Sequence, residues 1–404
     1  MRKRRLSGGV AALAVVAVAS ATACSSGGSS TTAASASSGA SSNVINVLDV
    51  TATSGATAIY GVQETLGLQA AAAYYNAHGG ILGKKVVITV VNDNADPATA
   101  TSLLTQQLSS NPGKYTMVWA GEEGTVSAAL IPIVKRYNVF TTAVNDGNNS
   151  CQQASACPDI FTQSGSTSAA EVADAAALKA AGYTKIGIIA DQATYDQSEL
   201  SYMEPDLQKV GISYDTVTFP PTAVSLSPEM AKLKSDGVQA VFALALGPAA
   251  GYVLTARSAL GWSVPLQFDV TGSSTDISSL VPASELNNVT ETIQYCENVK
   301  HNNPAFDLLV KNTPHPLAGN IICPIAGDGW GGMVLLAKAA EKANSLATSA
   351  LSSAASSLTI SDNEVSNPTK CWSSTDHEDV CEGPSYYEVV PAGKLMQTRL
   401  YPLG

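Results

Sequence analysis

The chain has 404 residues, of which 45% are hydrophobic and 14% charged, and its formal net charge is −11. An acidic surface without a basic stripe repels nucleic acids and anionic lipids, so a nucleic-acid partner is excluded. Beyond the N-terminal segment, no apolar run is long enough to span a bilayer.

The N-terminal segment has the organisation of an export signal. Residues 1–5 are Met-Arg-Lys-Arg-Arg, and residues 10–19 form an apolar stretch too short to cross a membrane. The segment ends in Ala21-Thr-Ala-Cys24, which resembles the bacterial lipobox. An ordinary signal peptide followed by a chance cysteine is the alternative. We predict a lipoprotein signal over 1–23, diacylation of Cys24, and anchoring on the outer face of the cell membrane.

A flexible tether is expected to follow this signal. Residues 24–43 are almost entirely Ser, Gly, Ala and Thr, a composition that cannot bury a core. Removal of the four basic residues of the signal moves the net charge from −11 to −15. The remaining chain of about 360 residues exceeds one comfortable core, which favours two lobes.

Six cysteines remain once Cys24 is set aside, and they fall as local pairs. In an oxidising compartment this pattern predicts disulfides that close surface loops. Proximity favours Cys151–Cys157, Cys296–Cys323 and Cys371–Cys381, although six cysteines allow 15 connectivities. Metal binding is the alternative, but no C-x-x-C occurs and the four histidines show no ligand spacing. We therefore expect no metal and no cofactor.

From residue 44 the chain alternates β-rich runs with helical stretches. Expected strands span 44–50, 86–91, 117–120 and 139–144. Three helices are expected between these strands. The first spans 62–77 and ends before Gly79-Gly80, the second begins at Asp96-Pro97, and the third spans 125–137. This alternation is typical of parallel sheets joined by right-handed crossovers.

The same pattern restarts after residue 164. Ser168-Ala-Ala-Glu171 has the form of a capping box. Further strands are expected at 185–190, 212–219, 238–246 and 265–270, with helices at 197–210, from Ser227-Pro228-Glu229, and at 249–260. The chain then returns with a long helix at 328–345, and 386–390 with 394–401 resemble a hairpin.

These elements predict an α/β protein with two doubly wound lobes, a hinge and a cleft between them. We expect lobe 1 to comprise 44–163 and about 288–345, and lobe 2 to comprise 164–287 and about 346–404. Open α/β sheets bind ligands at the carboxyl ends of their strands. The expected binding site is therefore the cleft between the two sets of strand-to-helix loops.

Several residues in these loops are candidate ligand contacts. Glu122, Glu123 and Thr125 join a strand to a helix whose free amides could hold an anionic group, although Thr125 could simply cap its helix. Tyr195 follows the first strand of the second lobe and could instead cover the core. Asp269 follows a later strand, and Asn145 follows the strand at 139–144; either could belong to a turn.

A longer motif resembles a known family. Asn76-Ala-His-Gly-Gly-Ile-Leu-Gly-Lys-Lys-Val-Val-Ile, followed by Asn92-Asp-Asn-Ala-Asp96-Pro97, is similar to a stretch of ABC-importer solute-binding proteins of the branched-chain amino acid and amide type. The similarity continues through 182–191, Tyr195, 260–265 and 328–330. It implies a periplasmic-binding-protein type I fold and capture of a small polar solute for a membrane permease.

The resemblance assigns roles to individual residues. The Ser/Thr that holds the substrate carboxylate in the family maps to Thr125, and the family's cleft tyrosine maps to Tyr195. The glycine that follows this tyrosine is replaced by Asp196. The family's ammonium-binding acid maps to Asp269 only after a one-place shift. Glu122 and Glu123 make the loop more acidic than in amino acid binders.

Other functions are less well supported by the sequence. No G-x-S-x-G nucleophile elbow occurs, so we expect no enzymatic activity. A ligand-sensing or partner-binding lipoprotein of the same fold, without a role in transport, is the alternative to solute import. We expect a monomer.

Overall fold

The computed structural model describes residues 43–55, 57–145, 151, 153–164, 168–270, 272, 277–297, 303–313, 321–362, 364–379, 381 and 383–392. Cys24, most of the predicted tether and the predicted strand at 394–401 lie outside the described residues. No described helix is both long enough and apolar enough to cross a membrane.

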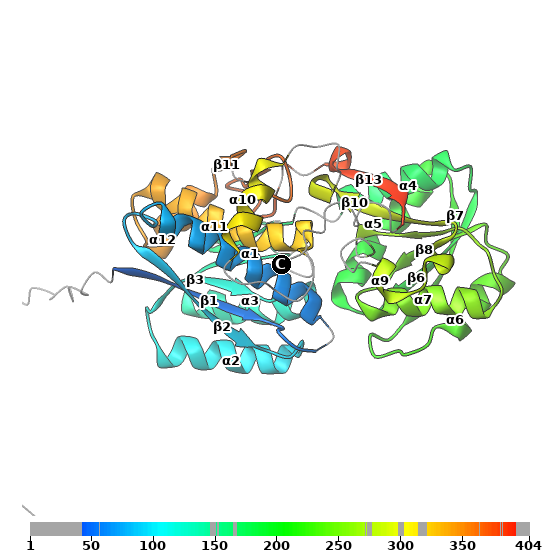
Figure 1. The fold of residues 1–404 in the computed structure, drawn as a ribbon, viewed down its shortest axis with the longest axis horizontal. Coiled ribbons are helices and arrows are strands. Elements are labelled where there is room, and N and C mark those ends of the chain that lie inside the picture. Colours follow the sequence, from blue (N-terminus) through cyan, green and yellow to red (C-terminus); the bar gives the residue numbers. More distant parts are fainter. Residues whose placement is uncertain are drawn as a thin grey trace, which may run out of the picture. The chain divides into compact units, whose positions relative to one another are not determined.

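The first lobe is built on a five-stranded parallel sheet with the order β2-β1-β3-β4-β5 (Figure 1). Its strands are β1 (Val44–Thr51), β2 (Lys85–Asn92), β3 (Tyr115–Ala120), β4 (Phe140–Ala143) and β5 (Ile160–Thr162). Its helices are α1 (Ala58–Ala77), α2 (Pro97–Ser110), α3 (Gly124–Tyr137), α10 (Pro304–Asn312), α11 (Cys323–Ala343) and α12 (Thr348–Ala355).

Alternating side chains of these strands feed two cores. Ile45 and Val47 of β1 pack with α1, α11 and α12, whereas Leu48 and Val50 pack with α2 and α3. A parallel sheet that is covered on both faces needs apolar residues at nearly every position. The apolar runs predicted as strands meet this requirement, and the predicted Asp96 cap is confirmed, since its carboxylate accepts from Thr99 N at 2.8 Å.

The second lobe contains a six-stranded sheet with the order β13-β10-β9-β8-β6-β7. Its strands are β6 (Lys185–Asp191), β7 (Ser213–Phe219), β8 (Ala240–Leu244), β9 (Leu266–Phe268), β10 (Val289–Gln294) and the antiparallel edge strand β13 (Tyr387–Pro391). Its helices are α4 (Ser168–Ala180), α5 (Thr194–Val210), α6 (Ser227–Ser235), α7 (Pro248–Ala259) and α9 (Ile277–Leu280).

The chain changes lobe at different points from those expected. Residues 289–294, predicted for the first lobe, form β10 and pair with β9 of the second sheet. Residues 348–371, predicted for the second lobe, form α12 and the small β11–β12 ladder (Thr359–Ile360 with Lys370–Cys371). Trp372 packs in the core of the first lobe, and its Nε1 donates to Thr162 O at 2.8 Å. No strand is predicted at 289–294 from the sequence, and only the pairing of β10 assigns this segment to a sheet.

All three disulfides join the pairs favoured by proximity. Four of these cysteines are buried rather than at the surface, namely Cys151, Cys157, Cys296 and Cys323. Cys296 follows β10 of the second lobe, and Cys323 is the first residue of α11 in the first lobe. The Cys296–Cys323 bond therefore closes the segment through which the chain returns to the first lobe.

Candidate functional site

A cavity of about 80 Å³ lies between the carboxyl ends of the two sheets. Residues of both lobes meet at its edge, where Gly247 N donates to the Tyr60 hydroxyl at 3.1 Å. Tyr60 also packs with Ile325 against Leu246. The cavity is lined by Tyr60, Glu64, Glu122, Glu123, Val144, Asn145, Ser164, Tyr195, Leu246, Val270, Gln294, Pro324, Ile325 and Asp328.

Glu64 and Asp328 are placed by the close approach of α1 and α11. A Cβ on Gly67 would lie 1.8 Å from Ala326 O, and a Cβ on Gly329 would lie 2.0 Å from Glu64 O. The two backbones can approach this closely only because glycine occupies both positions. The contact sets Glu64 and Asp328 on facing helices at the wall of the cavity.

The loop after β3 contributes Glu122 and Glu123. Glu122 is 2% exposed and accepts from Ala52 N at 3.2 Å and from Thr57 Oγ1 at 2.7 Å. Glu123 caps α3 by accepting from Thr125 N at 2.7 Å and from Val126 N at 3.1 Å. Thr125 therefore lies near the helix start, as predicted, but the expectation of free amides there is wrong, because the carboxylate of Glu123 accepts from them.

Burial dominates the ionisation of these carboxylates. It raises the pKa of Glu64 well above its usual range, and the nearby Glu122, Asp328 and Asp49 add to the effect while the Trp119 hydrogen bond opposes it. Burial and the adjacent Asp93 raise the pKa of Glu122 to about 8. Burial also raises the pKa of Glu123, against its helix-cap hydrogen bonds. At neutral pH the carboxyl group of Glu122 is therefore largely protonated.

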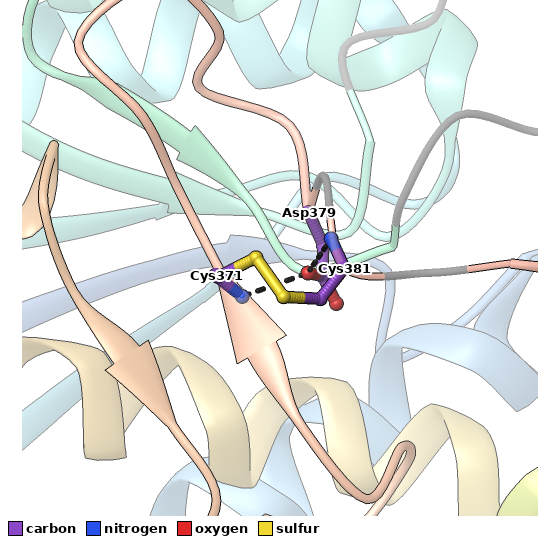
Figure 2. Close-up of side chains that lie close together, drawn as sticks. All are labelled: Cys371, Asp379 and Cys381. Carbon is purple, nitrogen blue, oxygen red and sulfur yellow. Dashed lines mark hydrogen bonds between the residues drawn. A yellow bond between two sulfur atoms is a disulfide. The ribbon is translucent and has the colours of Figure 1, made fainter.

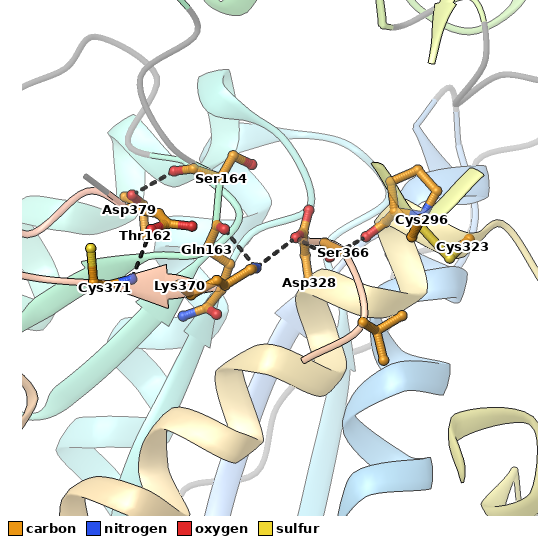
Figure 3. Close-up of polar contacts among 12 residues, drawn as sticks. Thr162, Gln163, Ser164, Cys296, Cys323, Asp328, Ser366, Lys370, Cys371 and Asp379 are labelled. Carbon is orange, nitrogen blue, oxygen red and sulfur yellow. Dashed lines mark hydrogen bonds and ion pairs between the residues drawn. A yellow bond between two sulfur atoms is a disulfide. The ribbon is translucent and has the colours of Figure 1, made fainter. Parts of the chain in front are cut away.

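Asp328 is held by a polar network behind the cavity wall (Figure 3). Its Oδ1 accepts from Ser366 Oγ at 2.9 Å and from the fully buried Lys370 Nζ at 3.2 Å. Lys370 also donates to Gln163 O at 2.7 Å. Burial raises the pKa of Asp328 although Lys370 opposes this shift. The ammonium of Lys370 therefore offsets the charge of Asp328 from behind the wall, without lining the cavity.

The structure brings together most of the predicted site residues. Glu122, Glu123, Asn145 and Tyr195 line the cavity. Thr125 instead lines an adjacent, larger pocket of about 420 Å³, which it shares with Glu123. Asp269 is fully buried and lines neither of these pockets, whereas its neighbour Val270 reaches the cavity.

Further carboxylates lie behind Tyr195. Glu171, Asp196, Glu199 and Asp269 are fully buried. Burial raises the pKa of Tyr195 well above its usual range, and the charges of Glu199, Asp269 and Glu171 raise it further. The predicted capping role of Glu171 does not fit this position, because its carboxylate is buried close to Glu199.

Sequence reasoning did not assign Tyr60, Glu64 or Asp328 to the site. Each of these three residues nevertheless has a sequence feature that could have indicated it. Tyr60 and Glu64 are one turn apart near the start of a helix that follows a strand, and Asp328 is the one charged residue in the apolar stretch 321–337. Their convergence, however, depends on two helices separated by about 260 residues of chain.

Among the described residues, one group has the spacing of metal ligands: Cys371, Asp379 and Cys381 (Figure 2). The two sulfur atoms are bonded to each other, so neither is a thiolate ligand. Asp379 Oδ1 accepts from Cys371 N at 2.8 Å and from Cys381 N at 3.1 Å. Its function here is to hold the disulfide loop.

Comparisons with solved structures identify the fold. A type 1 periplasmic binding protein from Bordetella pertussis has 19% identity and a TM-score of 0.73, over 89% of this chain and 100% of the other. A solute-binding protein of an ABC transporter from R. palustris, in complex with benzoate, has 18% identity and a TM-score of 0.72, over 89% of this chain and 96% of the other. A leucine-binding protein from Thermotoga maritima has 14% identity and a TM-score of 0.67, over 80% of this chain and 90% of the other.

A search of curated proteins gave no significant sequence match. The family model described as "Periplasmic binding protein" matches residues 45–381, which is most of the chain. This range contains every residue of the cavity wall and the strands of both sheets, except the edge strand β13 and the first residue of β1. The type I fold and the resemblance to leucine-binding-protein-like solute-binding proteins are confirmed, and the chain belongs to the periplasmic binding protein family.

Proposed function

We propose that the chain is the solute-binding component of an ABC importer, held outside the cytoplasm by lipid on Cys24. The observation that carries this proposal is the cavity, whose wall combines loops at the carboxyl ends of both sheets. Its volume of about 80 Å³ fits a small solute. The structural relatives include binding proteins of ABC transporters, and the family indicates an extracytoplasmic location.

The proposed contacts come from both lobes. Glu122 and Asn145 of the first lobe and Tyr195 of the second lobe would touch the solute directly. Thr125 would act from the neighbouring pocket, and Asp269 would act through Tyr195, whose pKa its charge raises. We expect a monomer that delivers its solute to the permease without altering it chemically.

A ligand screen tests this function. The mature protein is subjected to thermal unfolding with amino acids, amides, amines, organic acids, polyols and nucleosides. A solute at 100 times its dissociation constant stabilises the folded state by about 2.7 kcal/mol, which thermal unfolding detects readily. Small-angle scattering should then show compaction of the two lobes.

Variants of the cavity wall connect binding to the site. Tyr195→Ala should weaken binding about ten- to a hundredfold while the protein still folds, because a buried polar contact to a charged group contributes about 1.5–3 kcal/mol. Glu341→Gln, on the exposed part of α11, is the matched control. Binding that is unchanged in Tyr195→Ala would place the solute elsewhere. If no solute binds and the lobes never compact, the partner-binding alternative replaces import.

A further inference from the structure

We infer that the cavity takes a solute whose polar end is a cation with N–H donors, such as an amine or a guanidinium group, and rejects a free carboxylate. This inference rests on the proposed function and names the chemical class of its solute. Four observations support it: the occupied start of α3, the charges on the wall, two carboxylate oxygens without donors, and the tyrosines beside them.

The start of α3 is not available to a ligand carboxylate. A helix N-terminus presents free amides that bind anions. Here Thr125 N and Val126 N already donate to Glu123, at 2.7 Å and 3.1 Å. An anionic ligand would have to displace this carboxylate and then lie beside its charge.

The ionisable side chains on the cavity wall, apart from the tyrosines, are all carboxylic acids. Glu64, Glu122, Glu123 and Asp328 line it, and the set of described lining residues contains no lysine, arginine or histidine. Lys370 offsets Asp328 from behind the wall. If all four carboxylates are ionised, Lys370 neutralises the charge of Asp328 only. The other three negative charges then have no basic side chain among the lining residues to neutralise them. A carboxylate ligand would add another at the same place.

Two of these side chains have oxygens available to a donor. Glu64 is 1% exposed, and its Oε2 accepts from Trp119 Nε1 at 2.9 Å. Within the described part of the chain, no donor reaches its other oxygen. Asp328 is 6% exposed, and its Oδ1 takes both Ser366 and Lys370. Its Oδ2 likewise receives no hydrogen bond from the described residues. Both side chains line the cavity, so N–H donors of a solute could bind these two oxygens.

The rest of the wall suits the body of such a solute. Tyr60 and Tyr195 both line the cavity, and aromatic faces attract cations. Leu246, Val270 and Ile325 supply apolar surface for an alkyl or aryl group. The wall therefore combines carboxylates with apolar side chains.

Binding of a cation should release protons. The groups that face Glu64 are Glu122 from the loop after β3, Asp328 from α11, Asp49 from β1, and the indole N–H of Trp119 from β3. Among them, Asp49 and Glu122 retain protons near neutral pH, because burial raises their pKa values to about 7 and about 8. A cation favours the ionised forms, so its affinity should increase as pH rises from 6 to 8.

Solutes of matched shape test this inference on the purified mature protein. The first pair is benzylamine and benzoate. The second set is 3-methylbutylamine, leucine and 4-methylpentanoate, which share one branched skeleton but differ in charge. Calorimetry should give binding of at least one amine that is tenfold or more tighter than that of its matched acid. Titration in buffers of different ionisation enthalpy should show proton release.

Glu64→Gln is the decisive variant, because its amide oxygen can still accept from Trp119 while the charge is lost. Amine affinity should fall about ten- to a hundredfold, as for the loss of a charged hydrogen bond, and Glu341→Gln should bind like the wild type. The inference is overturned if a carboxylate solute binds as tightly as its matched amine, if no amine binds, or if Glu64→Gln binds amines like the wild type. Carboxylate binding with compaction would overturn the cation preference alone, whereas failure of every solute in the wider screen would overturn the proposed function as well.

Discussion

Replacement of Asp49 by Asn should flatten the pH dependence of folding stability. Asp49 is fully buried on β1, and its Oδ2 accepts from Thr65 Oγ1 of α1 at 2.7 Å. Burial raises its pKa from 3.8 to about 7, the Thr65 hydrogen bond opposes the rise, and the nearby Asp93 adds to it. The folded protein therefore holds a proton on Asp49 that the unfolded chain has lost.

The sign of the effect follows from proton linkage. Between about pH 4 and pH 7 the folded state binds more protons than the unfolded state, so folding stability decreases as pH rises. Below this pH range the Asp49 carboxyl group is protonated in both the folded and the unfolded state, and above the range it is ionised in both, so its contribution no longer changes with pH. A rise of about three pH units corresponds to about 4 kcal/mol for Asp49 across the window, or about 1.4 kcal/mol for each pH unit within it.

Urea unfolding at pH 5 and at pH 7 measures this contribution. The wild type should be more stable at pH 5, and Asp49→Asn should reduce the difference by about 3 kcal/mol. Asp174, whose pKa burial raises to about 7, should behave in the same way when replaced by Asn. Glu341→Gln, an exposed change, should leave the slope unaltered. A wild type that gains stability between pH 5 and pH 7, or an Asp49→Asn slope equal to that of the wild type, would refute the reasoning.

Three other changes test the remaining features. Cys24→Ser should abolish labelling by fatty acid and release the protein from the membrane, whereas an unlabelled wild type would contradict the lipobox. Replacing both Cys296 and Cys323 by Ala should lower the free energy of unfolding by about 3.5 kcal/mol under the chain-entropy estimate for a loop of 27 residues, and an unchanged urea midpoint would argue against it. Gly67→Ala should destabilise the protein by about 1–3 kcal/mol, because its Cβ would lie 1.8 Å from Ala326 O. A thermal unfolding midpoint equal to that of the wild type would show that α1 and α11 can separate without loss of stability.

Helix caps and helix ends can be predicted from the sequence because they depend on only a few neighbouring residues. Asp96-Pro97 caps α2 as predicted, and Gly211 ends α5 in the left-handed conformation that glycine favours. The alternation of apolar runs and helices likewise predicts two doubly wound lobes. The family motif around Asn76 then assigns the type I fold. Each of these features depends on neighbours in the chain.

The position of each segment in the lobes depends on pairing between distant residues. The strand at 289–294 has the same local character whether it joins the first sheet or the second, and its hydrogen bonds to β9 decide the matter. Similarly, Thr125 has the sequence of a helix cap, but the extended backbone and carboxylate of Glu123 take that position. Such competition between neighbouring caps is settled by backbone geometry.

The sequence by itself determined the fold class and identified four loop residues that line the cavity: Glu122, Glu123, Asn145 and Tyr195. It favoured the cysteine pairs by proximity alone, and the structure joins those pairs. Only the tertiary structure decided that Glu64 and Asp328 face the same space. Their helices approach closely because glycines on each admit the backbone of the other. The acidic character of the site arises from that packing, since it places carboxylates from remote parts of the chain within one buried, low-dielectric volume.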